Sequence, residues 1–266
     1  MLEQGRHDEM KDDPLPLPYT LDGTILIAGA SSGIGARFAR LFAAAGARLV
    51  LGARRTGRVE ALAAEIGEQA LAVPLDVTDE ASVIAAYDAA EARFGTVTGV
   101  VANAGVGTGG RSTDVPYEGL RGVIDTNLVG AYLVAREGAR RMIAGGSRER
   151  EDGRILLIGS ITAQLNHGGD AAYAATKAGL AHLGRQFARE WVRQGINVNT
   201  LQPGWIATEI NADWFASDRG RQDIQGLHRR RLLDDDALDD LALFLLSGRS
   251  RQVTGATFTL DDGQSL

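Results

Sequence analysis

The sequence predicts an α/β domain built on a doubly wound, parallel sheet of seven strands with helices on both faces. Two observations lead to this prediction. From residue 24 onwards, short runs of mostly aliphatic residues alternate with longer amphipathic segments, which is the pattern of successive βαβ units. The first short run then passes directly through a glycine-rich turn into an amphipathic segment, the arrangement that opens a Rossmann-type sheet.

The expected strands are short and bounded by turn residues, and they lie at residues 24–28, 48–52, 70–75, 99–102, 154–158, 197–201 and 258–260. The expected helices show a helical period of apolar residues and lie at 34–45, 58–66, 80–94, 117–144, 171–194 and 236–246. Gly46 and Gly95 stand where helices commonly end, and Thr78 and Asp79 stand where a helix begins.

Two segments lack such a period. Residues 1–20 are charged and then interrupted by Pro14, Pro16 and Pro18, so we expect a flexible N-terminal arm. Residues 21–266 are then expected to form one Rossmann-type domain. Within it, residues 205–231 have no clear period and are expected to form a lid or substrate loop.

Composition argues against several classes of protein. The chain of 266 residues is 44% hydrophobic and 23% charged, which is ordinary for a globular protein. Its net charge of −6 argues against binding nucleic acid, and no apolar stretch reaches the ~18 residues of a membrane span. Cysteine is absent and the four histidines lack metal-ligand spacing, so we expect no metal site and a cytoplasmic location.

The turn after the first expected strand contains three glycines, Gly29, Gly33 and Gly35. Because they lack a Cβ atom, the backbone can approach a phosphate closely, and the amides at the start of the next helix favour its negative charge. The turn therefore predicts a site for the pyrophosphate of a dinucleotide. The other expected members of this site are Ser31, Ser32 and Ile34.

The end of the second expected strand bears on the choice between NAD(H) and NADP(H). NAD-specific sheets of this type place a carboxylate there for the adenosine ribose, and this sequence has none. Arg54 and Arg55 stand there, and a guanidinium suits a 2′-phosphate. We therefore expect NADP(H), with Arg54 as the main contact. NAD(H) remains the alternative if both arginines are only solvated loop charges.

Tyr173 and Lys177 form a Y-x-x-x-K pair in a helical segment. Residues four apart share a helix face, so the phenol and the ammonium can approach one site. A nearby cation lowers the pKa of a phenol from about 10, which would suit Tyr173 to acid and base catalysis. Ser160 and Asn103 follow two strands at their carboxyl ends, where open α/β sheets bind ligands. The alternative is a surface tyrosine beside a solvated lysine.

Together these motifs resemble the short-chain dehydrogenase/reductase family, over about residues 24–266. The matching pieces are AGASSGIG at 28–35, LDVTD at 75–79, ANAG at 102–105, Asn127, Ser160, YAATK at 173–177 and QPGWIAT at 202–208. The resemblance implies a catalytic tetrad of Asn127, Ser160, Tyr173 and Lys177. Tyr173 would exchange the proton, Ser160 would hold the substrate oxygen, and Lys177 would lower the tyrosine pKa and bind the nicotinamide ribose.

The resemblance also implies further cofactor contacts. Asp76 and Val77 would meet the adenine ring, and the backbone carbonyl of Asn127 would hold a water near Lys177. The remaining implied contacts are Asn103, Ala104, Gly105, Pro203, Gly204, Ile206 and Thr208. The sequence departs from the family pattern outside the tetrad, at Ala28, Ala102 and Asp262, the last of which stands where many relatives carry glycine.

The expected activity is the NADP(H)-dependent interconversion of a ketone and a secondary alcohol by hydride transfer. The small-molecule substrate is expected to meet residues after Ser160 and in the 205–231 segment, namely Ile161, Leu165, Trp205, Trp214 and Phe215, with Gln164, Asn166 and His167 as neighbours. These apolar side chains favour a substrate with a hydrophobic part, but each is equally compatible with ordinary core or a subunit interface.

Three alternatives stay open on the sequence. The chain could reduce 3-oxoacyl thioesters of acyl carrier protein or coenzyme A, because His-Arg-Arg-Arg at 228–231 would attract an anionic substrate; a salt-bridged surface is the plainer interpretation. It could also be a regulator that binds NADP(H) without turnover, or a structural partner in an assembly. The resemblance further implies a homotetramer, or a homodimer, formed through the long helices and the last strand.

Overall fold

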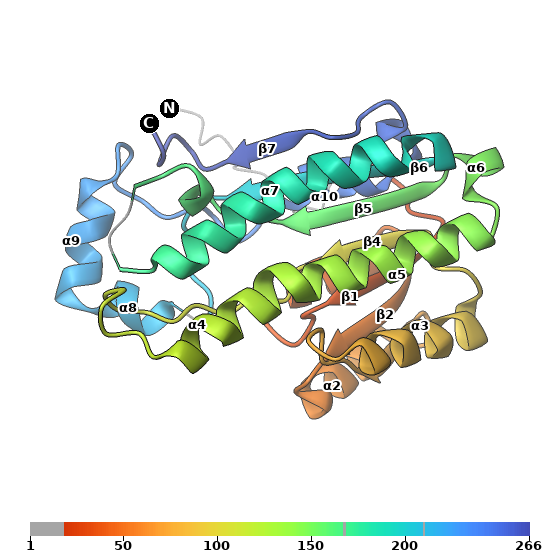
Figure 1. The fold of residues 1–266 in the computed structure, drawn as a ribbon, viewed down its shortest axis with the longest axis horizontal. Coiled ribbons are helices and arrows are strands. Elements are labelled where there is room, and N and C mark those ends of the chain that lie inside the picture. The colour runs from red at the N-terminus through yellow and green to blue at the C-terminus, as the bar shows by residue number, and fades with distance from the viewer. Residues whose placement is uncertain (1–18, 167–168, 210) are drawn as a thin grey trace, which may run out of the picture.

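The computed structural model describes residues 19–166, 169–209 and 211–266. Its seven strands form one parallel sheet in the order β3-β2-β1-β4-β5-β6-β7 (Figure 1). The strands are β1 (Thr24–Ala28), β2 (Arg48–Ala53), β3 (Ala70–Pro74), β4 (Gly99–Ala102), β5 (Gly153–Ile158), β6 (Ile196–Pro203) and β7 (Thr257–Leu260). The predicted Rossmann-type fold is confirmed. The strand order reverses between β1 and β4, which is where such sheets bind ligands.

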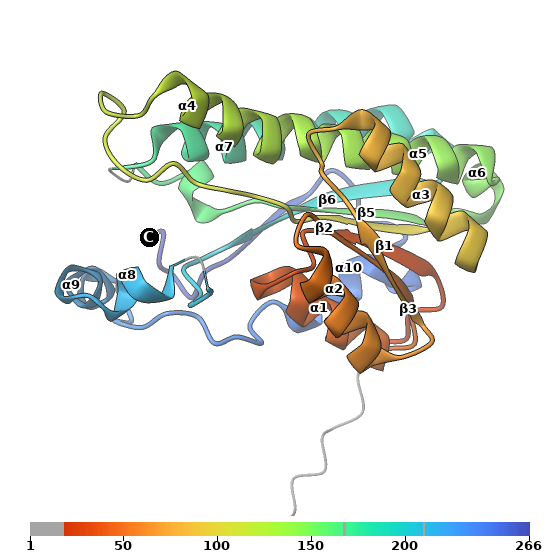
Figure 2. The same ribbon diagram turned by 90° about the horizontal axis from the view of Figure 1, so that it is seen from below.

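Helices cover both faces of the sheet, so the molecule has three layers (Figure 2). One layer contains α1 (Gly33–Ala44), α2 (Thr56–Ile66) and α10 (Asp239–Leu246). The other contains α3 (Glu80–Phe94), α4 (Tyr117–Ile124), α5 (Ala131–Ala144) and α7 (Ala171–Trp191). The short helix α6 (Ser147–Arg150) follows α5 at the end of this layer, while α8 (Ala212–Ala216) and α9 (Asp218–Gly226) lie apart from both layers.

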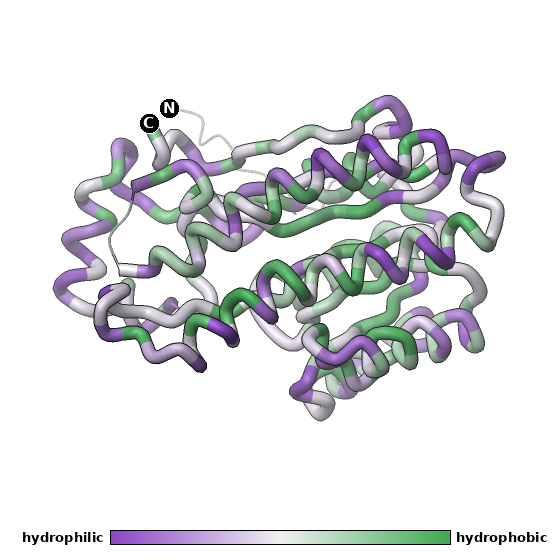
Figure 3. Tube along the Cα trace, in the orientation of Figure 1, coloured by the Kyte–Doolittle hydropathy of each residue, from purple (hydrophilic) through white to green (hydrophobic). Residues whose placement is uncertain are grey.

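The sheet is buried on both faces, as a parallel sheet with two helix layers must be. All five residues of β1 are buried, and its side chains alternate between two cores. Ile25 and Ile27 pack with Phe38 and Phe42 of α1. Leu26 packs on the other face, in the core that contains Tyr87 of α3. Figure 3 shows that the central strands consist mainly of hydrophobic residues, as burial on both faces requires. The two cores, one on each face of the sheet, hold the carboxyl ends of the strands in fixed positions.

Two predicted elements differ from the structure in kind, and several others differ by one to three residues at their ends. The helix expected at 117–144 is interrupted by a π-helical segment, Asp125–Gly130, which gives this helix a wider turn at Asn127. The segment 205–231, expected to be a loop, contains α8 and α9, which lie beyond the carboxyl ends of the strands (Figure 2). These helices are short, and their apolar period was too brief to recognise. The expected arm at 1–20 lies outside the described residues except for its end, where Tyr19 packs against Phe244.

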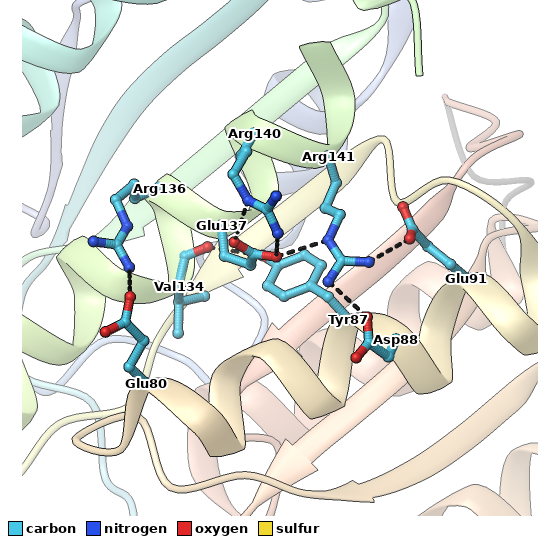
Figure 4. A network of polar contacts seen from close by, with 9 residues as sticks. All are labelled: Glu80, Tyr87, Asp88, Glu91, Val134, Arg136, Glu137, Arg140 and Arg141. Carbon is cyan, nitrogen blue, oxygen red and sulfur yellow. Dashed lines mark hydrogen bonds and ion pairs between the residues drawn. The ribbon is translucent and has the colours of Figure 1, made fainter. Parts of the chain in front are cut away.

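A network of ion pairs joins α3 to α5 (Figure 4). Arg141 lies 2.7 Å from Asp88, 2.5 Å from Glu91 and 2.7 Å from Glu137. The side chains of Arg141 and Glu137 are only 14% and 4% exposed, so water screens this network less than an ordinary surface pair. The hydrogen bond from Arg140, and to a smaller extent the one from Arg141, keeps the pKa of Glu137 below its usual value despite burial. The network thus fixes the helix layer that carries Asn127.

Candidate active site

The glycine turn between β1 and α1 is tightly packed against the end of β4. Gly29 and Gly33 have φ angles of 84° and 53°, in the region that favours glycine. A Cβ atom on Gly29 would lie 2.8 Å from the backbone of Ala104, and one on Gly35 would lie 2.2 Å from the carbonyl oxygen of Gly29. The Asn103 side chain donates to that same carbonyl at 2.9 Å. Any larger residue would therefore push β1 and β4 apart at the point where they would hold a cofactor.

The start of α1 has the properties of an anion site. Its N-cap, Ser32, makes no side-chain capping bond, and its first turn has no acidic residue. By contrast, α3 is capped by Asp79, whose carboxylate accepts from the amide of Ala81 at 3.0 Å. Amides at an uncapped helix start favour a phosphate group. The donors of this turn thus fit the pyrophosphate of a dinucleotide.

Arg55 contacts the same turn, whereas the sequence predicted Arg54 as the main arginine of the cofactor site. Its guanidinium donates to the Ser31 hydroxyl at 2.8 and 3.1 Å and to the Ser32 hydroxyl at 2.7 Å. Arg54 is exposed and contributes to the lowered pKa of Asp76, whose largest cause is the hydrogen bond from the Thr78 amide. Spacing alone could not tell which arginine folds back over the glycine turn, because that depends on the path of the chain after β2.

The two residues expected near the adenine ring lie after β3. One oxygen of Asp76 accepts from the amide and hydroxyl of Thr78, at 3.0 and 2.8 Å. Val77 is buried, and a Cβ atom on Gly130 would lie 2.5 Å from its side chain. Its side chain therefore packs against the π-helical segment, which leaves only its backbone for contact with an adenine.

Helix α7 brings Tyr173 and Lys177 to one face, beside the end of β5. The ammonium nitrogen of Lys177 lies 5.4 Å from the centre of the Tyr173 ring and donates to the carbonyl oxygen of Ile158 at 2.8 Å. Lys177 is 4% exposed, and this burial lowers its pKa to about 8. The alternative of a solvated lysine is therefore wrong for this chain.

The surroundings of Tyr173 change one electrostatic expectation. The sequence predicted a lowered pKa for this phenol, but burial raises its pKa, and the charge of Asp170 acts in the same direction. A hydrogen bond with Ser160 acts against them. The Ser160 hydroxyl in turn accepts from the Thr162 hydroxyl at 2.9 Å. The hydroxyls of Thr162 and Ser160 therefore form a hydrogen-bonded chain that ends at the phenol. Because its pKa is raised, the phenol remains protonated at neutral pH.

Asn127 lies close to the same site. Its side chain accepts from the amide of Val106 at 2.8 Å and donates to the carbonyl of Val106 at 2.9 Å, which ties the π-helical segment to the chain after β4. A Cβ atom on Gly105 would lie 3.5 Å from the Asn127 side-chain oxygen and 3.6 Å from the Lys177 ammonium. The four members of the expected tetrad thus come from three neighbouring elements around one point.

The segment after β6 closes the other side of this cleft. Thr208 lies 3.5 Å from where a Cβ atom of Gly33 would stand, so it faces the glycine turn. Ile206 is buried and pairs with Leu233 through a β-bridge. A Cβ atom on Gly204, which follows Pro203 at the end of β6, would lie 2.4 Å from the Gln264 side chain. This packing holds the segment across the carboxyl end of the sheet.

The residues expected beside the substrate are only partly brought together. Trp205 and Phe215 pack edge to face, with ring centres 6.3 Å apart, and Leu165 is half-buried. Ile161 is 1% exposed and belongs to the packed interior, while Trp214 is 46% exposed and lies under the guanidinium of Arg219. Residue 167 lies outside the described residues.

A cavity of about 300 Å³ lies next to the tetrad and was not predicted from the sequence. It is lined by Thr108, Gly110, Ser112, Val115, Leu120, Ala171 and Ala172. Asp170 stands at its edge, accepting from the Thr108 hydroxyl at 2.9 Å and from the Tyr173 amide at 3.3 Å. The glycine-rich stretch 105–110 and an aspartate just before the helix of Tyr173 were the available signals. Their proximity depends on the tertiary structure.

Two other surface features have a structural explanation. Arg229 and Arg231 pair with Asp262 at 3.1 and 2.8 Å, which confirms the plainer, salt-bridged interpretation of the basic run. Asp262 has a φ of 52°, in the left-handed region that favours glycine. In the part of the chain that the structure describes, no helix is both long and apolar enough to span a bilayer.

The fold and this cleft define a nicotinamide-dependent oxidoreductase of the Rossmann type, and comparisons with known proteins agree. The family described as enoyl-(acyl carrier protein) reductase matches residues 29–265. Oxidoreductase UcpA of Escherichia coli strain K12 is 35% identical, over 91% of this chain and 94% of that protein. The chain belongs to the short-chain dehydrogenase/reductase family.

Two solved structures are similar throughout. A 3-ketoacyl-(acyl-carrier-protein) reductase from Brucella melitensis, complexed with NADH, is 33% identical with a TM-score of 0.84, over 92% of this chain and 98% of that one. A gluconate 5-dehydrogenase from Burkholderia cenocepacia, in complex with NADP and tartrate, is 31% identical with a TM-score of 0.86, over 94% and 97%. Relatives with this fold therefore include proteins with either nicotinamide cofactor, and the cofactor is NAD(P)(H).

Proposed function

We propose that the chain interconverts a small ketone and the matching secondary alcohol, with Tyr173 as the acid and base and with NADP(H) preferred. The observation that carries this proposal is the convergence of Tyr173, Ser160 and the buried Lys177 at the carboxyl end of β5. A buried cation is costly and is retained where chemistry needs it. The bound nicotinamide supplies or accepts the hydride.

In the reductive direction, the Ser160 hydroxyl donates a hydrogen bond to the substrate oxygen, and its own oxygen is held by Thr162. Tyr173 gives its proton to the same oxygen as negative charge develops there, and the product is a neutral alcohol. The Lys177 ammonium stabilises the phenolate that results. Reversing the proton transfer turns the phenolate into the base that oxidises an alcohol.

Tyr173→Phe tests the proposal, because it removes the proton donor and retains the ring. We expect oxidation of NADPH with a panel of ketones to fall by about 10²–10⁴-fold. NADPH binding, followed by fluorescence, should change little. Unchanged turnover would refute the role of Tyr173, and nucleotide binding without turnover in the native protein would favour a regulator.

We propose that Arg54 and Arg55 together bind the 2′-phosphate of NADP(H), with Arg55 held over Ser31 and Ser32. The kcat/KM for NADPH should exceed that for NADH, and Arg54→Ala should lower this preference by about tenfold, the value of one charge-assisted hydrogen bond. A preference for NADH in the native protein, or an NADPH preference that this substitution leaves unchanged, would contradict the assignment.

Reduction of 3-oxoacyl thioesters is the second candidate, favoured by similarity to the Brucella reductase. It predicts higher activity with acetoacetyl thioesters than with simple alkyl or aryl ketones. The pairing of Arg229 and Arg231 with Asp262 weakens this candidate, since one carboxylate offsets part of the positive charge that would attract an anionic substrate. One substrate panel separates the two activities.

We further propose that the protein acts in the cytoplasm as a homotetramer, or as a homodimer. Large hydrophobic side chains are exposed along α4, the π-helical segment and α5, at Tyr117, Leu120, Val129, Tyr132 and Ile143. Exposed apolar surface of this kind is typical of subunit interfaces. Residues 21–266 are proposed to act as one catalytic domain, preceded by the arm.

A further inference from the structure

We propose that Glu209, in the segment after β6, competes with the 2′-phosphate of the cofactor for Arg55 and Arg58 and so moderates the preference for NADP(H). This inference rests on the proposed cofactor site and adds a specificity-determining residue to it. Glu209 lies outside the glycine turn and the end of β2, the two places where the sequence predicted phosphate contacts.

The contacts of Glu209 carry the argument. Its carboxylate accepts a hydrogen bond from Arg58, in the first turn of α2, and lies 3.8 Å from a terminal nitrogen of Arg55. These arginines are far from Glu209 in the sequence and lie on the opposite side of the cofactor cleft. One acidic side chain therefore partly neutralises two cations, of which Arg55 contacts the glycine turn.

Arg55 lies between the Glu209 carboxylate and the proposed position of the 2′-phosphate, beside Ser31 and Ser32. Its Nε and one terminal nitrogen face the hydroxyls of Ser31 and Ser32, while its other terminal nitrogen faces Glu209. A phosphate held by the serines would use this same guanidinium. It would also lie near the negative charge of Glu209, and like charges at short range repel. The carboxylate should therefore weaken the binding of a 2′-phosphate but not of a ribose hydroxyl.

The position of the segment supports this competition. Thr208, the neighbour of Glu209, faces Gly33 of the phosphate turn, and its amide donates to the Asn211 side chain at 2.7 Å. The chain on the amino-terminal side of Glu209 is thus held against the turn by packing. The carboxylate therefore starts beside the turn that an entering phosphate would approach.

The chain offers a matched control in the ion pair between Arg40 of α1 and Glu65 of α2. Its side chains are 52% and 52% exposed, against 49% and 58% for Arg58 and Glu209. It joins the same helix α2 to a neighbour, but neither residue contacts the glycine turn in the described structure. Glu65→Gln therefore removes a comparable surface pair and leaves the cofactor site alone.

The test is calorimetric titration of the full chain at low ionic strength with adenosine 2′,5′-bisphosphate and with 5′-AMP. Glu209→Gln should bind the bisphosphate about two- to fivefold more tightly, the range for one exposed ion pair, and 5′-AMP with little change. Glu65→Gln should alter neither. Arg58→Met, which leaves the Glu209 carboxylate with Arg55 alone, should weaken bisphosphate binding. The kcat/KM ratio of NADPH to NADH should rise in Glu209→Gln by the same factor.

Unchanged or weaker binding of the bisphosphate to Glu209→Gln would overturn the inference, as would an equal gain for 5′-AMP. These results leave the proposed function standing if the native protein binds both nucleotides and reduces ketones. If the native protein binds neither nucleotide, the proposed function itself fails. The two failures are therefore distinguishable.

Discussion

At the scale of single residues, the site is governed by competition between burial and charge. Burial lowers the pKa of Lys177 and raises the pKa of Tyr173, so both side chains resist ionisation. The hydrogen bond from Ser160 partly offsets burial of the phenol. The resting site therefore stores a proton on Tyr173, which suits reduction more directly than oxidation.

This arrangement predicts the pH dependence of ketone reduction. The ammonium of Lys177, with a pKa of about 8, is charged below that pH and neutral above it. Because Tyr173 remains protonated through this range, the rate should be level at neutral pH and fall as pH rises through about 8. Initial rates with saturating NADPH check this. A rate that increases from pH 7 to pH 9 would contradict it, and Lys177→Arg, if active, should lose the alkaline decline.

At the scale of elements, the start of α7 links catalysis to the cavity. The Asp170 carboxylate caps the helix at the Tyr173 amide and also holds Thr108 of the chain after β4. A single side chain therefore positions the helix that carries the phenol and the wall of the cavity. The capping aspartate of α3, Asp79, has only the first of these roles in the described structure.

Asp170→Ala should accordingly have two effects. Loss of the cap should lower the free energy of unfolding by about 1 kcal/mol, and release of Thr108 should raise the KM for the ketone about two- to tenfold. Urea denaturation and steady-state kinetics measure the two effects. Asp79→Ala is the control, with a similar loss of stability and an unchanged KM. Equal kinetic effects of both substitutions would show that Asp170 acts only through stability.

At the scale of the whole molecule, parallel topology gathers the site. The glycine turn, Asn103, Ser160 and the segment after β6 all follow strands at the same edge of the sheet. Among the described residues, the amino-terminal ends of the strands carry no candidate site residue. The outer face of α4 and α5 is left with exposed apolar side chains, so the single chain does not cover all of its hydrophobic surface.

The proposed assembly predicts a mass in solution of about four times the 28.2 kDa chain, or about twice for a dimer. Tyr132 is 40% exposed on α5, and Tyr132→Glu would place a charge in the proposed interface, so a smaller species should form. Size-exclusion chromatography with light scattering measures this. Ala64→Glu on α2, in the opposite helix layer, should leave the mass unchanged. A monomeric native protein would refute the proposal.

The fold was predictable from local pattern because the apolar residues that recur at strand and helix periods are the residues that the structure buries. β1 was predicted with its observed bounds, since its aliphatic run ends at Gly29. Predicted ends were less accurate where packing extends an element, as for β6, which continues to Pro203 beside β7. Residues in α8 and α9 were missed because two short helices at a site edge have too few turns to show a period.

The sequence by itself determined the fold class, the family and the residues of the expected tetrad, because each depends on residue types at short, regular spacing. Only the tertiary structure decided that Arg55, more than Arg54, contacts the serines, that burial raises the pKa of Tyr173, and that Glu209 lies beside Arg58. These properties come from distances between segments far apart in the chain. Such distances are set by packing of the whole domain, which no local pattern records.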